Sequence, residues 1–295
     1  MVREVLRCLR PGPGDAAVDC TLGGGGHAQA ILEHLCPGGR LIGIDVDPVE
    51  LPHAEERLRA AGFGPDVCVA RHASFADLPA VLSAEGLTNA DLIFADLGVS
   101  AMQFDNADRG FSYKGVGPLD MRMNPLAGES AARLIARSSE GELVRLLEDN
   151  ADEPHAALIA RLLTESPSDT THAVDRLLRA GLHAAIPGVT KTDVKMSIRR
   201  TFQALRIAVN DEFSALDALL RSIPQCLAPG GRVAVITFHS GEDRRVKQAF
   251  RAGHRAQVYS AVATEVIRST KAETFANRRA SAAKLRWAVR ATNTA

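Results

Sequence analysis

Four consecutive glycines stand in the stretch VDCTLGGGGHAQAIL, between a short apolar run and a helix-like segment. Gly23 and Gly25, followed by Ala28, fit the relaxed Gly-x-Gly-x-x-Gly/Ala pattern, in which the backbone turns sharply and approaches a ligand closely. Asp45 follows 22 residues after Gly23, where a carboxylate accepts hydrogen bonds from ribose hydroxyls. No Gly-Lys-Ser/Thr follows the loop, which excludes a Walker-type phosphate site. The pattern predicts an adenosine-containing ligand, and both NAD and S-adenosylmethionine satisfy it.

Two further stretches place reactive side chains directly after apolar, strand-like runs. Asp96 ends the run ADLIFAD, where its carboxylate would face the reactive end of the ligand; capping of the next turn is the competing interpretation. His239 and Ser240 follow VAVITF, at the rim of the expected site, although a lone histidine at such a place is more often a hydrogen-bonded structural group. The chain has no Ser/His/Asp order and no His-Glu-x-x-His motif, which disfavours hydrolase chemistry.

These residues need a scaffold that brings the ends of several strands together. The first hundred residues alternate strand-like and helix-like patterns, which predicts a parallel sheet with helices on both faces. Ligands in such sheets collect at the carboxyl ends of the strands. The expected strands are residues 16–20, 38–47, 66–74 and 90–98.

The pattern changes after the fourth expected strand. Residues 103–125 are rich in Gly, Asp and Arg with little periodicity, which predicts a long ordered loop or a lid. Helical periodicity alone covers 129–184, and 199–227 is predicted as one long amphipathic helix. A strand pattern returns at 228–240, so the sheet is interrupted and then completed. The predicted domains are residues 1–106 and 199–295 for the sheet, and 107–198 for the loop and an inserted helical domain.

Composition narrows the class of protein. The chain has 295 residues, 46% of them hydrophobic, and a net charge of zero, which argues against non-specific attraction of the whole molecule to nucleic acid. No apolar run has the ~18–20 residues of a membrane span, and the first residues do not resemble a signal peptide. Five scattered cysteines without a Cys-x-x-Cys pair disfavour structural zinc and favour a reduced, cytoplasmic setting. Nine basic residues against two acids between Arg251 and Arg290 form a solvated face or a phosphate-binding surface.

Together these stretches resemble the MraW/RsmH family of S-adenosylmethionine-dependent methyltransferases, which modify the N4 amine of a cytosine in the decoding region of bacterial 16S rRNA. The resemblance runs in order from about residue 4 to residue 287. It implies a class I (Rossmann-like) α/β methyltransferase sheet with an inserted all-helical domain. The blocks that carry it are VDCTLGGGGHAQAIL, IGIDVDP, ADLGVSAMQFDNADRGFSYKGVGPLDMRM, RRTFQALRIAVNDE, APGGRVAVITFHSGEDRRVK and NRRASAAKLR.

The resemblance also implies site residues. Asp45 would hold the ribose and Phe75 would lie against the adenine, while Asp96 and Gln103 would border the sulfonium. S-adenosylmethionine is already activated, so no metal is expected; the product is S-adenosylhomocysteine. The full set of implied cofactor contacts is Gly25, Gly26, His27, Asp45, Phe75, Asp96 and Gln103.

On the substrate side, Asp96 is the predicted acceptor of the amine proton, with Asp120 and His239 as further catalytic candidates. The expected partner is 16S rRNA in the small ribosomal subunit or a late assembly intermediate, with no membrane; a homodimer is compatible with the sequence. Basic side chains are expected to contact RNA phosphates. These are Arg109, Arg122, Arg199, Arg200, Arg278 and Arg279.

Several substrate-side blocks depart from the family pattern while the cofactor blocks are intact. The departures lie at Ala151–Glu153, Lys195–Thr201, Gly241 and Asn277–Arg279, and the usual opening block is missing. They predict a divergent member, with a shifted RNA target left open. The alternatives are an NAD-dependent oxidoreductase, a methyltransferase of another RNA or DNA amine or of a small molecule, and a catalytically weak RNA-binding relative.

Overall fold

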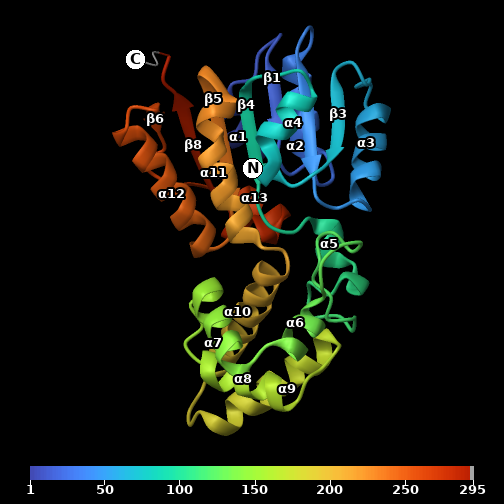
Figure 1. The fold of residues 1–295 in the computed structure, drawn as a ribbon, viewed down its shortest axis with the longest axis vertical. Coiled ribbons are helices and arrows are strands. Elements are labelled where there is room, and N and C mark those ends of the chain that lie inside the picture. The colour runs from blue at the N-terminus through green and yellow to red at the C-terminus, as the bar shows by residue number, and fades with distance from the viewer. Residues whose placement is uncertain (293–295) are drawn as a thin grey trace. The chain divides into compact units, whose positions relative to one another are not determined.

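The computed structural model describes residues 1–292 (Figure 1). The chain forms two compact units. One, the sheet unit, combines Met1–Gly98 with the chain from Phe213 onward; the other, the helical unit, is Val99–Glu212. Within residues 1–292, no helix has the length and apolar character needed to cross a membrane.

The sheet unit is built on one mixed sheet with strand order β3-β2-β1-β4-β5-β8-β6, and the short β7 pairs with β8. The first five strands are parallel, whereas β8 runs antiparallel to its neighbours β5 and β6. The order reverses direction between β1 and β4, which is where sheets of this kind bind ligands. The strands are Ala16–Asp19 (β1), Arg40–Asp45 (β2), Cys68–His72 (β3), Ala90–Asp96 (β4), Leu227–Thr237 (β5), Tyr259–Val262 (β6), Ile267–Arg268 (β7) and Lys284–Arg290 (β8).

Helices cover both faces of this sheet (Figure 1), which explains why its strands are almost continuously apolar. Successive residues of a strand point to opposite faces. Ile93 of β4 therefore joins the core beneath α4, α11 and α12, while Leu92 and Phe94 join the core beneath α1, α2 and α3. The helices of this unit are Val2–Leu9 (α1), Gly26–Leu35 (α2), Glu50–Ala60 (α3), Leu78–Ala84 (α4), Glu212–Cys226 (α11), Ser240–Arg255 (α12) and Lys271–Ala276 (α13).

The helical unit has its own apolar core, to which helices α6 to α10 all contribute. Most of its helices start at side-chain caps, although α8 does not. Ser139 and Glu142 form a capping box at α7, as do Thr190 and Asp193 at α10, which satisfies amide groups that a helix start leaves open. Asn150 of α7 donates a hydrogen bond to the Ala204 carbonyl of α10, 3.2 Å away. The helices are Ala101–Asp105 (α5), Ala131–Arg137 (α6), Glu140–Ala151 (α7), Ala156–Glu165 (α8), Thr171–Ala185 (α9) and Lys191–Val209 (α10).

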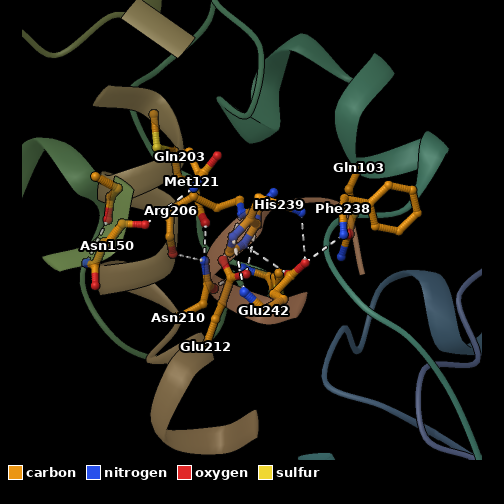
Figure 2. Close-up of polar contacts among 12 residues, drawn as sticks. Gln103, Met121, Asn150, Gln203, Arg206, Asn210, Glu212, Phe238, His239 and Glu242 are labelled. Atoms are coloured by element: carbon orange, nitrogen blue, oxygen red, sulfur yellow. Dashed lines mark hydrogen bonds and ion pairs between the residues drawn. The ribbon is translucent and has the colours of Figure 1, made fainter. Parts of the chain in front are cut away.

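The predicted long loop is held in place by buried polar contacts. The Asn210 side chain accepts a hydrogen bond from the Met123 amide (2.7 Å) and donates to the carbonyls of Met121 and Arg206, both at 2.8 Å (Figure 2). The Arg109 guanidinium is buried and donates to the carbonyls of Arg122 (3.1 Å) and Met123 (2.8 Å). The loop is thus ordered by contacts within the helical unit.

Two sequence predictions about chain organisation differ from the structure. Residues 199–227 are two helices rather than one, because the chain breaks between α10 and α11 where Asp211 adopts a left-handed φ of 48°. The predicted division after residue 198 falls inside the continuous helix α10, and the units divide at Glu212/Phe213 instead. The other division lies at Gly98/Val99 rather than after residue 106, since α5 and its capping box belong with the loop that follows.

Candidate functional site

Three aspartates end three neighbouring strands of the sheet unit. Asp19 ends β1, Asp45 ends β2 and Asp96 ends β4. Asp19 is in register with Gly43 of β2 and Phe94 of β4, so Asp45 and Asp96 each stand two residues beyond it. The sheet therefore gathers three carboxyl groups at its carboxyl edge, on both sides of the point where the strand order reverses.

The glycine loop joins β1 to α2 and is tied to one of these carboxylates. The Gly23 amide donates to Asp45 Oδ2 (2.7 Å), and the Asp47 amide donates to Asp45 Oδ1 (2.9 Å). Gly23 and Gly25 have left-handed φ values of 50° and 75°, a conformation that glycine adopts without steric cost. Each Asp45 oxygen can accept a second hydrogen bond, so the carboxylate remains able to bind hydroxyls.

Asp19 is the most deeply buried of the three aspartates, with 1% of its surface exposed. Its Oδ1 accepts the Thr21 amide (3.0 Å), and its Oδ2 has no hydrogen-bond partner. Burial raises the pKa of Asp19 to about 7, and the negative charges of Asp96 and Asp45 add to the increase. A buried oxygen without a partner is uncommon in folded proteins and indicates a place for a ligand donor.

Asp96 is linked to β1 through Thr21. The Asp96 amide donates to the Thr21 hydroxyl oxygen at 2.6 Å. Asp96 Oδ2 lies 3.5 Å from His27 Nδ1, while Asp96 Oδ1 and His27 Nε2 are buried without hydrogen-bond partners. Burial raises the pKa of Asp96 to about 7 and lowers the pKa of His27 to about 4. His27 is therefore neutral at physiological pH, so it cannot form an ion pair with Asp96.

Two further predicted cofactor contacts, Phe75 and Gln103, come from other segments of the chain. Phe75 begins a short 3-10 helix that follows β3, and its half-buried ring packs against the core on the α4 side of the sheet. Gln103 belongs to the helical unit, where its buried side chain accepts a hydrogen bond from the Ser100 amide (2.8 Å) as part of a capping box. Within its own unit, Gln103 thus has a structural role that sequence reasoning missed.

The two further catalytic candidates are held by neighbouring residues. Burial raises the pKa of Asp120, but its bidentate ion pair with Arg122 (2.7 and 2.9 Å) and the Arg122 amide lower it more, so the net shift is downward. His239 caps α12: its Nδ1 accepts the Glu242 amide at 3.4 Å, and its Nε2 lies 3.1 Å from Glu242 Oε1 (Figure 2). The contacts of Asp120 favour a structural role. His239 caps α12 through Nδ1, whereas its buried Nε2 makes no hydrogen bond, so the catalytic role of His239 stays a prediction.

The predicted RNA-binding arginines divide into two groups. Arg109 is buried against loop carbonyls and Arg122 is paired with Asp120, so structural contacts account for both. Arg199 is exposed and Arg200 half-buried on α10, and two more arginines are exposed after α13. The second group, Arg199, Arg200, Arg278 and Arg279, remains accessible to phosphates.

Residues 1–291 match the family model described as the MraW methylase family. The chain belongs to this family. A ribosomal RNA small subunit methyltransferase H 2 of Alkaliphilus metalliredigens is 42% identical, over 98% of this chain and 84% of that protein. A ribosomal RNA small subunit methyltransferase H of Myxococcus xanthus is 48% identical, over 85% of this chain and 78% of that one. A solved rRNA methylase of Streptococcus thermophilus aligns with a TM-score of 0.44 at 10% identity, covering 98% of this chain and 93% of that chain.

Membership of the MraW family agrees with the strand order described above and confirms the predicted class I methyltransferase fold and the S-adenosylmethionine dependence. The carboxyl edge fits such a cofactor for two reasons. Its glycine loop allows the backbone to approach the cofactor closely, and several buried polar atoms have no hydrogen-bond partner within the protein. These unpartnered atoms at the carboxyl edge are Asp19 Oδ2, Asp96 Oδ1 and His27 Nε2. Sequence reasoning did not single out Asp19 or Thr21, although both stand directly before the glycines in VDCTLGGGG.

Proposed function

We propose that this MraW family member transfers a methyl group from S-adenosylmethionine to the exocyclic N4 amine of a cytosine in small-subunit ribosomal RNA. The observation that carries the proposal is the family match over residues 1–291. The curated relatives that share over 40% of its residues are named as ribosomal RNA small subunit methyltransferases. The intact carboxyl edge of the sheet unit supports the same reaction.

The cofactor would be held by the carboxyl edge. Asp45 would accept hydrogen bonds from the ribose hydroxyls, and Phe75 would lie against the adenine. The amides of Gly26 and His27, at the start of α2, would bind the carboxylate of the methionine moiety, because amide groups in the first turn of a helix are open to anions. The Gly25 amide donates to the Leu22 carbonyl (2.7 Å), so Gly25 would contact the same moiety through the close approach of its backbone. When bound, S-adenosylmethionine supplies an electrophilic methyl group on a positively charged sulfur.

The chain's own residues would position and deprotonate the amine. The lone pair of an aryl amine is delocalised into the ring, so the enzyme must hold the nitrogen in line at ~3–3.5 Å from the carbon that it attacks. Asp96 Oδ1 is buried and without a partner, and in its ionised form it can accept a hydrogen bond from the amine and then the proton that leaves. A pKa of about 7 suits this role, since a general base acts best when its pKa lies near the working pH.

The target cytosine must leave its stack to reach such a site, and single-stranded RNA offers bases that can do so. We propose the small ribosomal subunit, or a late assembly intermediate, as the form recognised. The exposed Arg199, Arg278 and Arg279 and the half-buried Arg200 would neutralise backbone phosphates. We also propose a cytoplasmic location, because ribosomal subunits are assembled there. A homodimer stays a prediction that light scattering tests.

The decisive experiment is labelled methyl transfer to small ribosomal subunits that lack the modification, with nucleoside mapping of the product. We expect N4-methylcytidine at one position. With the cofactor at a saturating concentration, which calorimetry sets for each variant, Asp96→Asn should slow transfer by about 10²- to 10⁴-fold, the usual contribution of a positioned general base. Full activity of Asp96→Asn would remove Asp96 as the acceptor. Cofactor binding by the wild-type protein without transfer to any RNA would instead identify a non-catalytic relative.

A further inference from the structure

The most exposed large apolar side chain within residues 1–292 is Phe275, on the outside of α13 in the sheet unit. Its exposed fraction is 91%, against 81% for Leu126 and 73% for Val116 in the helical unit. A phenyl ring buries 150–250 Å² when it packs in a protein. Here that area stays in water, so the folded sheet unit gains nothing from an aromatic residue at this position.

The segment around Phe275 is anchored, so the ring is held outward by a fixed backbone. The neighbouring Glu273 pairs with the N-terminal amine of Met1. Ser269 Oγ contacts Thr274 Oγ1 (3.0 Å) and donates to the Ala280 carbonyl (2.8 Å). Residues 273 and 274 are thus turned toward the body of the sheet unit, and residue 275 points away from it.

The surroundings of Phe275 carry excess positive charge. Lys271, four residues earlier in α13, shares its helix face, and both it and Arg278 are exposed, as is Arg268 of β7. The acid in this segment, Glu273, is matched by the N-terminal amine. An exposed phenyl ring surrounded by positively charged side chains is complementary to single-stranded nucleic acid. The bases of such a strand can stack on the ring, and its phosphates can contact the cations.

We infer that Phe275 is a stacking platform for an unpaired base of the RNA substrate, with Lys271 and Arg278 contacting the adjacent phosphates. This inference rests on the proposed function for the identity of the RNA. Stacking of a base on an aromatic residue tolerates any base, because every base has a π face. Phe275 therefore contributes affinity rather than the choice of the methylated nucleotide.

The test compares Phe275→Ala, Phe275→Tyr and Arg278→Ala in the full chain, with Leu126→Ala as the matched control of an exposed apolar residue. The probe is a fluorescein-labelled 12-nucleotide single-stranded RNA, titrated at several salt concentrations. We expect Phe275→Ala to weaken binding by about 5- to 150-fold, the range for loss of one base stack, and Phe275→Tyr to restore it. Leu126→Ala should bind as the wild type does.

Salt dependence separates stacking from charge. Phe275→Ala should leave the slope of log K against log [salt] unchanged, whereas Arg278→Ala should reduce it by about 0.7, the value for one phosphate contact on a single strand. RNA affinity within twofold of wild type in Phe275→Ala, or a loss that Tyr does not restore, would overturn the inference. So would a dimer that Phe275→Ala converts to monomer without a change in RNA affinity, because the ring would then bind a second copy of the chain.

The two proposals can fail independently. If wild-type protein methylates small subunits while Phe275→Ala binds RNA normally, the stacking inference is wrong and the function stands. If RNA binding depends on Phe275 but wild-type protein transfers no methyl group to any RNA, the stacking inference stands and the proposed function is wrong.

Discussion

The buried Asp19 should contribute to the pH dependence of the stability of the sheet unit, and Asp19→Asn should remove that contribution. Its pKa is raised by burial to about 7 in the folded protein, whereas an unfolded chain has an Asp pKa of about 3.9. Between these values the folded protein holds a proton that the unfolded chain has released, so the free energy of unfolding falls as pH rises. The decrease starts above the lower pKa and is complete once pH exceeds about 7.

The size of the effect follows from the two pKa values. A pKa raised from about 3.9 to about 7 costs the folded state about 4 kcal/mol at high pH, and about 2.5 kcal/mol of this develops between pH 5 and pH 8. Asparagine is isosteric and does not titrate; its Oδ1 can still accept the Thr21 amide. Its amide nitrogen would replace the oxygen that has no hydrogen-bond partner. Relative to wild type, the variant should therefore gain stability as pH rises through this window.

Urea unfolding at pH 5, 6, 7 and 8, followed by fluorescence, measures this difference. The one tryptophan of the chain, Trp287, lies in β8 and so reports on the sheet unit. Asp243→Asn is the control: burial raises the pKa of Asp243, but its contacts with Arg286 and Lys284 lower it more, so its titration lies below this window. The difference between that variant and wild type should stay constant with pH. Equal pH dependence in wild type and Asp19→Asn would refute the reasoning.

Two pairs of substitutions test how the site and the loop are held. Thr21→Val removes the acceptor of the Asp96 amide, so it should lower the free energy of unfolding by about 1–3 kcal/mol and slow methyl transfer. Thr21→Ser keeps the hydroxyl and should have wild-type stability and rate. Equal rates of methyl transfer for the Val and Ser variants would exclude a positioning role for Thr21. Gly110 has a φ of 73°, and a Cβ there would lie 2.2 Å from the Pro118 carbonyl oxygen. Gly110→Ala should therefore destabilise the helical unit by more than about 2 kcal/mol, as measured by circular dichroism. Gly128→Ala is the control, because Gly128 has a similar φ of 71° but open space around its Cβ position. It should cost only about 1–2 kcal/mol.

The sheet was predictable because its signals are local. An apolar run that ends in an aspartate locates a strand and its carboxyl end together, so Asp45 and Asp96 could both be placed at the same edge. The parallel pairing of β2, β1 and β4 then required no long-range information beyond the alternation of strands and helices. The break at Asn210 and Asp211 was not predictable in this way. It depends on contacts that Asn210 makes with Met121 and Met123, far away in sequence.

The state of the site residues was predictable only in part, because pKa and pairing depend on what surrounds each group in space. The sequence suggested His239 as a catalytic candidate, yet its ring nitrogens are directed at Glu242, a partner that only the geometry of α12 makes evident. Arg109 looked like a phosphate ligand by charge, but it donates to carbonyls 13 and 14 residues further along. Which basic residues stay exposed is decided by how the loop folds back on itself.

The same dependence on surroundings explains why the carboxyl edge indicates a ligand more strongly than its sequence motif does. Burial raises the pKa of both Asp19 and Asp96 to about 7, and the negative charge of Asp96 adds to the increase at Asp19. A fold selected for stability alone would place asparagine or an apolar residue at such positions, because an unpartnered buried oxygen costs about 1–3 kcal/mol. A positively charged ligand reverses this balance, since it favours the ionised carboxylates and offers them hydrogen bonds. The unpartnered oxygens of Asp19 and Asp96 thus lower the stability of the sheet unit and strengthen the binding of such a ligand.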